Sequence, residues 1–130
     1  KAAHGHVFVP SGFVAAEYRE VRREHGQDVP EIWRVREVLD ARTLADEGKR
    51  MGHCVYSYAH RIDRREVSIW SVQMEDGHGE TGRWHQVTVE VNNALRRVVQ
   101  ARGRFNRSMT PRERTIVARW ASRNALALAV

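Results

Sequence analysis

The chain has 130 residues, 42% of them hydrophobic, and carries a formal net charge of +6 at pH 7. This size suits one domain that buries its own core, and the single cysteine excludes an internal disulfide. No apolar run approaches the ~20 residues that a membrane-spanning helix needs, and no basic-then-apolar leader opens the sequence. The sequence therefore predicts one domain over residues 1–130, cytoplasmic and without a membrane partner.

The positive charge is concentrated near the C-terminus. Residues 94–130 contain nine arginines and one acid, Glu113, for a local balance of +8, whereas residues 1–93 have a balance of −2. Arginine's planar guanidinium suits two-point contact with phosphate, and a basic segment of this kind is typical of nucleic-acid binding. A GC-rich genome would explain arginine over lysine, but it would not gather one sign of charge in one segment. We therefore expect DNA or RNA as a partner.

The N-terminal third is predicted to be helical. Three helices are expected there, over residues 12–25, over 31–39, and from Asp40 or Thr43 to Gly48. Ser11 can cap the first, in which Val14, Tyr18 and Val21 recur at helical spacing. A turn over 26–30 separates the first helix from the second.

A further helix is predicted over residues 53–62, directly after a break at Gly52. Its first turn would hold Cys54, beside His53. A thiol in that position sits among unpaired backbone N–H groups at the positive end of the helix dipole, which favours the thiolate. Cys54 is therefore a candidate nucleophile, although cysteine is also often buried as a plain hydrophobe.

Three strands are predicted to follow as an antiparallel meander. They cover residues 67–72, 84–91 and 95–102, and a glycine-rich loop over 75–82 joins the first two. Alternation along the second strand would place His85 on the face of the valines that follow it, and Thr88 and Glu90 on the other face.

The last predicted element is a helix with a clear start. Thr110, Pro111 and Glu113 supply an N-cap, a proline at the first helical position and the glutamate of a capping box. The apolar stripe of this helix comprises Ile116, Val117, Trp120 and Leu128, and beside it lies a basic ridge of Arg112, Arg119 and Arg123. The fold class is thus α+β: N-terminal helices, a three-stranded antiparallel β-meander and a C-terminal helix.

Motifs spread over most of the chain resemble those of the PcfJ-like protein family. The matching pattern is Trp33, Leu44-x-x-Glu47-Gly48-x-x-Met51-x-His53-Cys54-Val55-x-x-Tyr58, Ser68-Ile69, Thr88-x-Glu90, Gln100-x-Arg102-Gly103-x-x-Asn106 and Trp120. The resemblance is strongest over about residues 31–122. Members are encoded on conjugative plasmids, phages and related mobile elements and have no established activity. The resemblance implies a mobile-element setting and a shared group of polar residues, but no reaction.

Some of these polar residues form a candidate catalytic group. They are His53, Cys54, Glu90 and Gln100; His85, which the matching pattern does not include, is a weaker candidate. In one interpretation the chain is a hydrolase or transferase with a papain-like core, in which His85 activates Cys54 and Gln100 or Asn92 orients the imidazole.

In a second interpretation His53 is an acid or base with Glu90 as its carboxylate partner, as in a nuclease or nucleotide-modifying enzyme. A structural interpretation also fits, in which His53 caps its helix and Glu90 pairs with Arg102. The residues single out no metal site and indicate no cofactor.

The predicted nucleic-acid contacts lie in the last third of the chain. They are Arg102, Arg104, Arg107, Arg112, Arg119, Arg123 and the aromatic Phe105. Gly103 would allow close backbone approach, and Phe105 could stack on a base; alternatively, the loop is merely solvated and Phe105 is packed in the core. The leading hypothesis is a nucleic-acid-directed domain of a mobile element. The alternatives are the cysteine-dependent enzyme and a protein-interaction module of a transfer apparatus.

Overall fold

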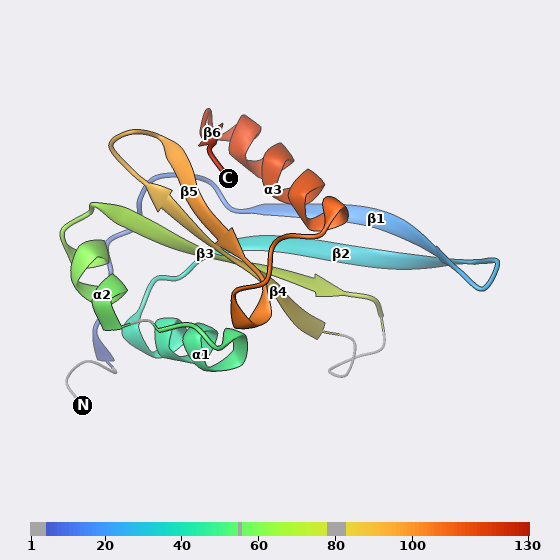
Figure 1. Ribbon diagram of the computed structural model, residues 1–130, viewed down its shortest axis with the longest axis horizontal. Coiled ribbons are helices and arrows are strands. Elements are labelled where there is room, and N and C mark those ends of the chain that lie inside the picture. The colour runs from blue at the N-terminus through green and yellow to red at the C-terminus, as the bar shows by residue number, and fades with distance from the viewer. Residues whose placement is uncertain (1–4, 55, 78–82) are drawn as a thin grey trace.

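A six-stranded, curled, mixed sheet with helices on both faces makes up the part of the chain that the structure describes (Figure 1). The computed structural model describes residues 5–54, 56–77 and 83–130. The strands lie side by side in chain order: β1 (Ala16–Glu24), β2 (Gln27–Glu37), β3 (Val67–Glu75), β4 (Arg83–Asn92), β5 (Arg97–Arg102) and β6 (Ala127–Leu128). Neighbours pair antiparallel except β5 and β6, which pair parallel.

The α-helices lie on the two faces of this sheet. They are α1 (Ala41–Met51), α2 (Tyr56–Asp63) and α3 (Pro111–Arg123), and a short 3-10 turn, η3 (Arg104–Asn106), follows β5. α1 and α2 cover one face and α3 covers the other (Figure 1). The α+β class is confirmed, but the sheet has six described strands rather than three.

The helices predicted over residues 12–25 and 31–39 are wrong, because these segments form the hairpin of β1 and β2. Along β2, Glu31, Trp33 and Val35 are buried while the residues between them are more exposed, which is the period of two of a strand. The turn residues His25 and Gly26 both have positive φ, of 51° and 76°, as a two-residue hairpin loop requires. Short apolar segments are compatible with both the helical period of 3.6 residues and the strand period of two, and hydrogen-bonded pairing with β3 makes this segment a strand.

The predicted meander corresponds to β3, β4 and β5, the centre of the larger sheet. The loop predicted over residues 75–82 falls largely outside the described residues, and Glu75 itself ends β3. The helix predicted over 53–62 begins later, at Tyr56, and the short helix predicted before it extends to Met51.

The C-terminal helix is confirmed, with both hydrogen bonds of its capping box: Glu113 N donates to Thr110 Oγ1 and Thr110 N to a Glu113 carboxylate oxygen. Leu128 does not belong to its stripe, because the helix ends at Arg123 and Leu128 lies in β6.

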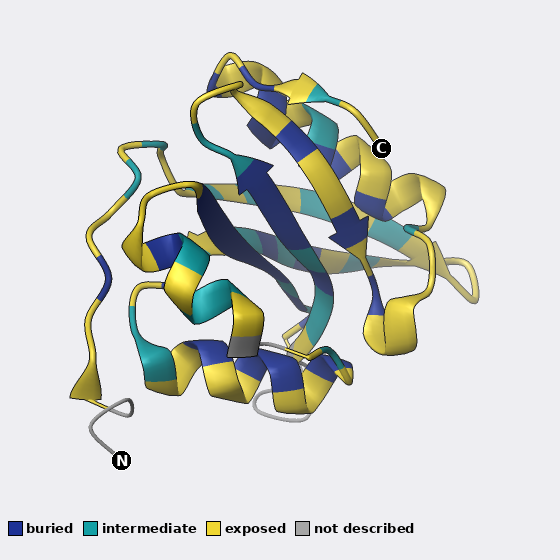
Figure 2. Ribbon diagram, turned by 60° about the vertical axis from the view of Figure 1, so that its left-hand side comes forward, coloured by how far each residue is buried: buried dark blue, intermediate teal, exposed yellow. Residues whose placement is uncertain are grey.

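The larger core lies between α3 and the sheet, where the Trp70 and Trp120 ring centroids are 4.7 Å apart. On the opposite face a smaller apolar cluster forms under α1 and α2 around Leu44, Ile62 and Ile69. Figure 2 shows the buried residues of β3 and β4 running between these layers. No helix among the described residues has the length and hydropathy that a membrane crossing requires. The smaller core leaves part of the sheet free, and the candidate site occupies that part.

Candidate functional site

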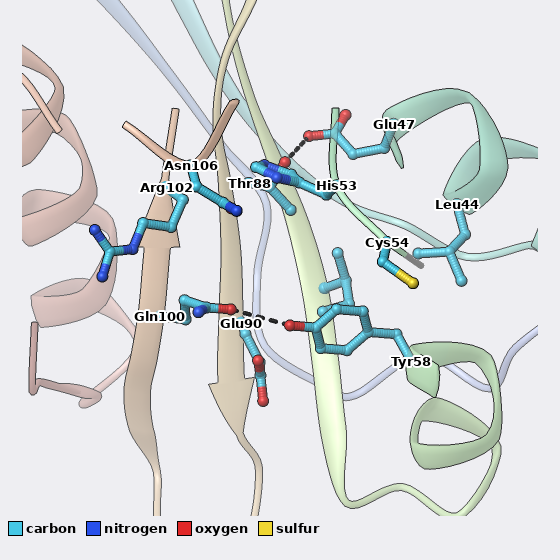
Figure 3. A pocket seen from close by; sticks show the side chains of 11 residues that line it. Leu44, Glu47, His53, Cys54, Tyr58, Thr88, Glu90, Gln100, Arg102 and Asn106 are labelled. Atoms are coloured by element: carbon cyan, nitrogen blue, oxygen red, sulfur yellow. Dashed lines mark hydrogen bonds between the residues drawn. The ribbon is translucent and has the colours of Figure 1, made fainter. Parts of the chain in front are cut away.

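A pocket of about 230 Å³ lies between the end of α1, α2 and the strands β4 and β5 (Figure 3). Its walls are formed by Leu44, Glu47, His53, Cys54, Tyr58, Ile69, Thr88, Glu90, Gln100, Arg102 and Asn106. The structure thus brings together His53, Cys54, Glu90 and Gln100, which come from three separate stretches of the sequence. His85 is not among the residues that line the pocket.

The end of α1 places His53 and Cys54 at the pocket. Gly52 ends this helix in the left-handed conformation (φ 70°), and the backbone N–H groups of Gly52 and His53 both donate to Gly48 O. The chain therefore turns sharply and delivers two side chains into the space between the helices. His53 Nε2 is shielded from solvent and has no hydrogen-bond partner among the described residues.

Cys54 does not lie in the first turn of a helix, because α2 begins at Tyr56. It instead lies between α1, which ends at Met51 with Gly52 as its C-cap, and α2. Its side chain is exposed and makes no hydrogen bond with a described residue. The predicted placement of Cys54 in the first turn of a helix is therefore wrong.

Tyr58 reaches across the pocket from α2 to β5, where its hydroxyl donates to Gln100 Oε1 at 3.0 Å (Figure 3). Partial burial of the phenol raises the pKa of Tyr58 to about 12, and the negative charge of Glu90 adds to this effect. The phenol is therefore a neutral hydrogen-bond donor at physiological pH.

Absorbance titration of the tyrosinates should detect this shift. The difference between the titrations of the parent chain and Tyr58→Phe gives the ionisation of Tyr58, which is expected to have a midpoint near pH 12. Glu90→Gln should lower that midpoint, because it removes a negative charge next to the phenol. Since the folded pKa lies above the ordinary value, the stability that the neutral phenol contributes is fully present below pH 10 and is lost as pH rises through 12. A midpoint near 10 in the folded protein would contradict the burial of this phenol.

Glu90 is 8% exposed and lies beside Arg61 of α2, with Oε2 3.3 Å from a guanidinium nitrogen. It forms no hydrogen bond or ion pair with His53 or Arg102 in this structure, although His53 and Arg102 line the same pocket. Register places Glu90 opposite Gln100 on β5, so the two side chains share one face of the sheet, and both line the pocket.

Glu47 lines the pocket but was not among the catalytic residues predicted from the sequence. Its carboxylate, 1% exposed, accepts hydrogen bonds from Ser71 Oγ at 2.7 Å and from Thr88 Oγ1, and His85 Nδ1 lies 2.8 Å away. Glu47 lies on the buried face of α1, in line with Leu44 and Met51. An acid on the apolar face of a helix is the signal that could have identified it.

A β-bulge explains why His85 faces Glu47. Val72 pairs with Val87 but Gln73 pairs with His85, so β4 has one extra residue at this point. The extra residue reverses the alternation and turns His85 away from the valine face. The predicted face of His85 is therefore wrong, and its carboxylate partner is Glu47.

Three of the six arginines predicted to contact nucleic acid form ion pairs within the fold. Arg107 donates to both Glu113 oxygens at 2.8 Å, Arg112 to Glu31 at 2.6 Å, and Arg119 to Glu20 at 2.8 Å. The other three, Arg102, Arg104 and Arg123, form no ion pair with a described residue, and the same is true of Arg114. The ridge on α3 is thus largely neutralised by acids of neighbouring elements.

Gly103 has a role different from the one expected. A Cβ at this position would lie 2.3 Å from the guanidinium carbon of Arg107, so the glycine makes room for an arginine of the same loop. Arg107 also donates to the backbone oxygens of Gln86 and Ser108. Its side chain fastens the loop to α3.

Phe105, directly before the pocket-lining Asn106, is 72% exposed, so it is not packed in the core. Its ring rests on the end of α1, where a Cβ on Gly52 would be 2.5 Å from Phe105 Cδ1. The guanidinium of Arg104 is 5.0 Å from the ring centroid. We call Arg102, Arg104, Phe105 and Asn106 the β5–η3 rim.

Comparison with known proteins identifies the family but assigns no activity. Searches among curated proteins and among solved structures gave no significant match. The family model described as PcfJ-like protein matches residues 18–117, which cover strands β1 to β5, the pocket and the first half of α3. The chain therefore belongs to the PcfJ-like protein family.

Proposed function

We propose that this domain binds nucleic acid at the β5–η3 rim and presents the bound segment to the adjoining pocket. The observation that carries the proposal is Phe105, an aromatic ring 72% exposed that lies against Gly52, precedes the pocket-lining Asn106 and is accompanied by Arg104. Exposed aromatic rings beside arginines are the usual means of holding bases and phosphates together.

The distribution of free positive charge supports the same surface. Arg102 and Arg104 form no ion pair with a described residue, so their guanidinium groups are available to phosphate. Arg107, Arg112 and Arg119 are engaged with acids and are removed from the predicted contact set. The proposed contact surface is therefore smaller than the sequence suggested and is centred on the pocket. The resemblance to proteins of plasmids and phages supports a mobile-element setting for it.

Fluorescence anisotropy with labelled oligonucleotides across a series of salt concentrations tests the proposal. We expect affinity to fall steeply with salt, and the double variant Arg102→Ala/Arg104→Ala to weaken binding at every concentration and to reduce the slope of log K against log salt by about 1 to 2. Arg19→Ala is the matched control, because Arg19 is 74% exposed on the distant hairpin. Absence of affinity for DNA and RNA at low ionic strength would refute the proposal.

A further inference from the structure

We infer that the rim selects single-stranded nucleic acid, with one unpaired base stacked on Phe105 and its neighbour inserted into the pocket. This inference rests on the proposed function and specifies its substrate class. It distinguishes single strands from duplexes, which a purely electrostatic surface would bind through their phosphates.

The Phe105 ring is a fixed platform. Phe105 and Asn106 both have positive φ, of 55° and 63°, and η3 holds them in a tight turn between β5 and α3. The Cδ1–Cε1 edge of the ring lies against Gly52, where a Cβ would come within 2.5 Å of Cδ1, and this contact limits the movement of the ring. A base can stack on such a platform only if it is not already stacked between neighbours in a duplex.

The pocket is suited to a single base by size and by chemistry. Its volume of about 230 Å³ lies below the usual range of small-molecule sites, so it admits a single ring system but no paired bases. Tyr58 supplies an aromatic ring, and Gln100 and Asn106 supply amide donors and acceptors that can hydrogen-bond an unpaired base edge. In a duplex those base edges are occupied by the complementary strand.

A groove of about 460 Å³ on the other side of β5 provides a path for the phosphate backbone. Gln100 and Arg102 line both the pocket and this groove, so the two are contiguous. The groove also contains Ser108 and Arg114, and Arg114 forms no ion pair with a described residue. In Figure 3 the Arg102 guanidinium points away from Tyr58, toward the outer side of β5. Arg102 and Arg114, which form no ion pair with a described residue, thus line a narrow groove that fits the phosphate backbone of a single nucleic-acid strand.

Anisotropy titrations with a labelled single strand and with the same strand in a duplex, as DNA and as RNA, test this inference. We expect the single strand to bind about tenfold more tightly. Phe105→Ala should weaken single-strand binding about fivefold or more and leave duplex binding unchanged, because it removes a stacking surface and no charge. Arg114→Ala should lower the salt slope for the single strand by about 0.7. Trp84→Ala removes another exposed aromatic, 41% exposed, and is the control.

The outcomes separate this inference from the proposed function. Equal affinity for single strand and duplex, or a Phe105→Ala variant that binds like the parent chain, would overturn the inference while nucleic-acid binding stands. No binding to either probe would refute the proposed function itself. Circular dichroism of each variant establishes that it is folded, and Phe105→Tyr should restore single-strand binding because it restores the ring.

Discussion

Replacing Glu47 by alanine is expected to lower the free energy of unfolding by about 3 to 5 kcal/mol, because it removes the acceptor of a buried hydrogen-bond network together with side-chain volume. The Glu47 carboxylate is 1% exposed and is shared by Ser71, Thr88 and His85. Its removal leaves three polar groups without their acceptor and a void beneath the pocket. Urea unfolding followed by circular dichroism gives the measurement.

Two variants separate this effect from a general sensitivity of α1. Glu47→Gln keeps one acceptor oxygen and should cost less than the alanine. Asp46→Ala alters the adjacent residue, which forms only an exposed i,i+4 pair with Arg50, and should change stability by less than about 0.5 kcal/mol. If Glu47→Ala costs no more than Asp46→Ala, Glu47 does not organise the floor of the pocket.

Replacing Arg107 by alanine is expected to lower the free energy of unfolding by about 2 to 4 kcal/mol. The Glu113 carboxylate is 2% exposed, and the substitution would leave it buried without the guanidinium that now pairs with it. The loss should also loosen the loop, since Arg107 connects Glu113 with the Gln86 carbonyl of β4. Thermal and urea unfolding provide the measurement.

Arg104→Ala is the matched control for this prediction. Arg104 stands three residues earlier and forms no ion pair with a described residue, so its removal should change stability by less than about 0.5 kcal/mol while weakening nucleic-acid binding. Arg107 is thus expected to affect the stability of the fold, and Arg104 the affinity for nucleic acid. A stable Arg107→Ala variant would return Arg107 to the set of contact residues.

The paired charges limit how far net charge can be translated into a binding surface. The last third of the chain has a balance of +8, yet Glu31 and Glu20 of the β1–β2 hairpin neutralise two arginines of α3 across the fold. Six arginines of this third form no ion pair with a described residue: Arg102 and Arg104 lie in the β5–η3 rim, Arg114 lines the groove beside β5, and Arg96, Arg97 and Arg123 lie around the start of β5 and the end of α3. The contact surface proposed at the rim uses only some of them and predicts recognition of a few nucleotides rather than wrapping of a duplex.

The amino-acid sequence by itself determined the parts of the fold that depend on local signals. Examples are the capping box of α3, the strands β3 and β4, which are rich in β-branched residues, and the α+β class. Each of these follows from residues close together in the chain. The motif pattern also identified the PcfJ-like family, and four of the candidate site residues lie around one pocket.

Only the tertiary structure decided what depends on partners far away in the chain. Pairing with β3 made a strand of residues 27–37, and a bulge in β4 turned His85 toward Glu47. Distant acids decided which arginines are free, and the closure of α1 by Gly52 placed Cys54 behind a helix rather than at the start of one. These outcomes follow from strand register, burial and charge neutralisation. Most of these contacts join residues tens of positions apart, so the spacing of residues along the sequence does not predict them.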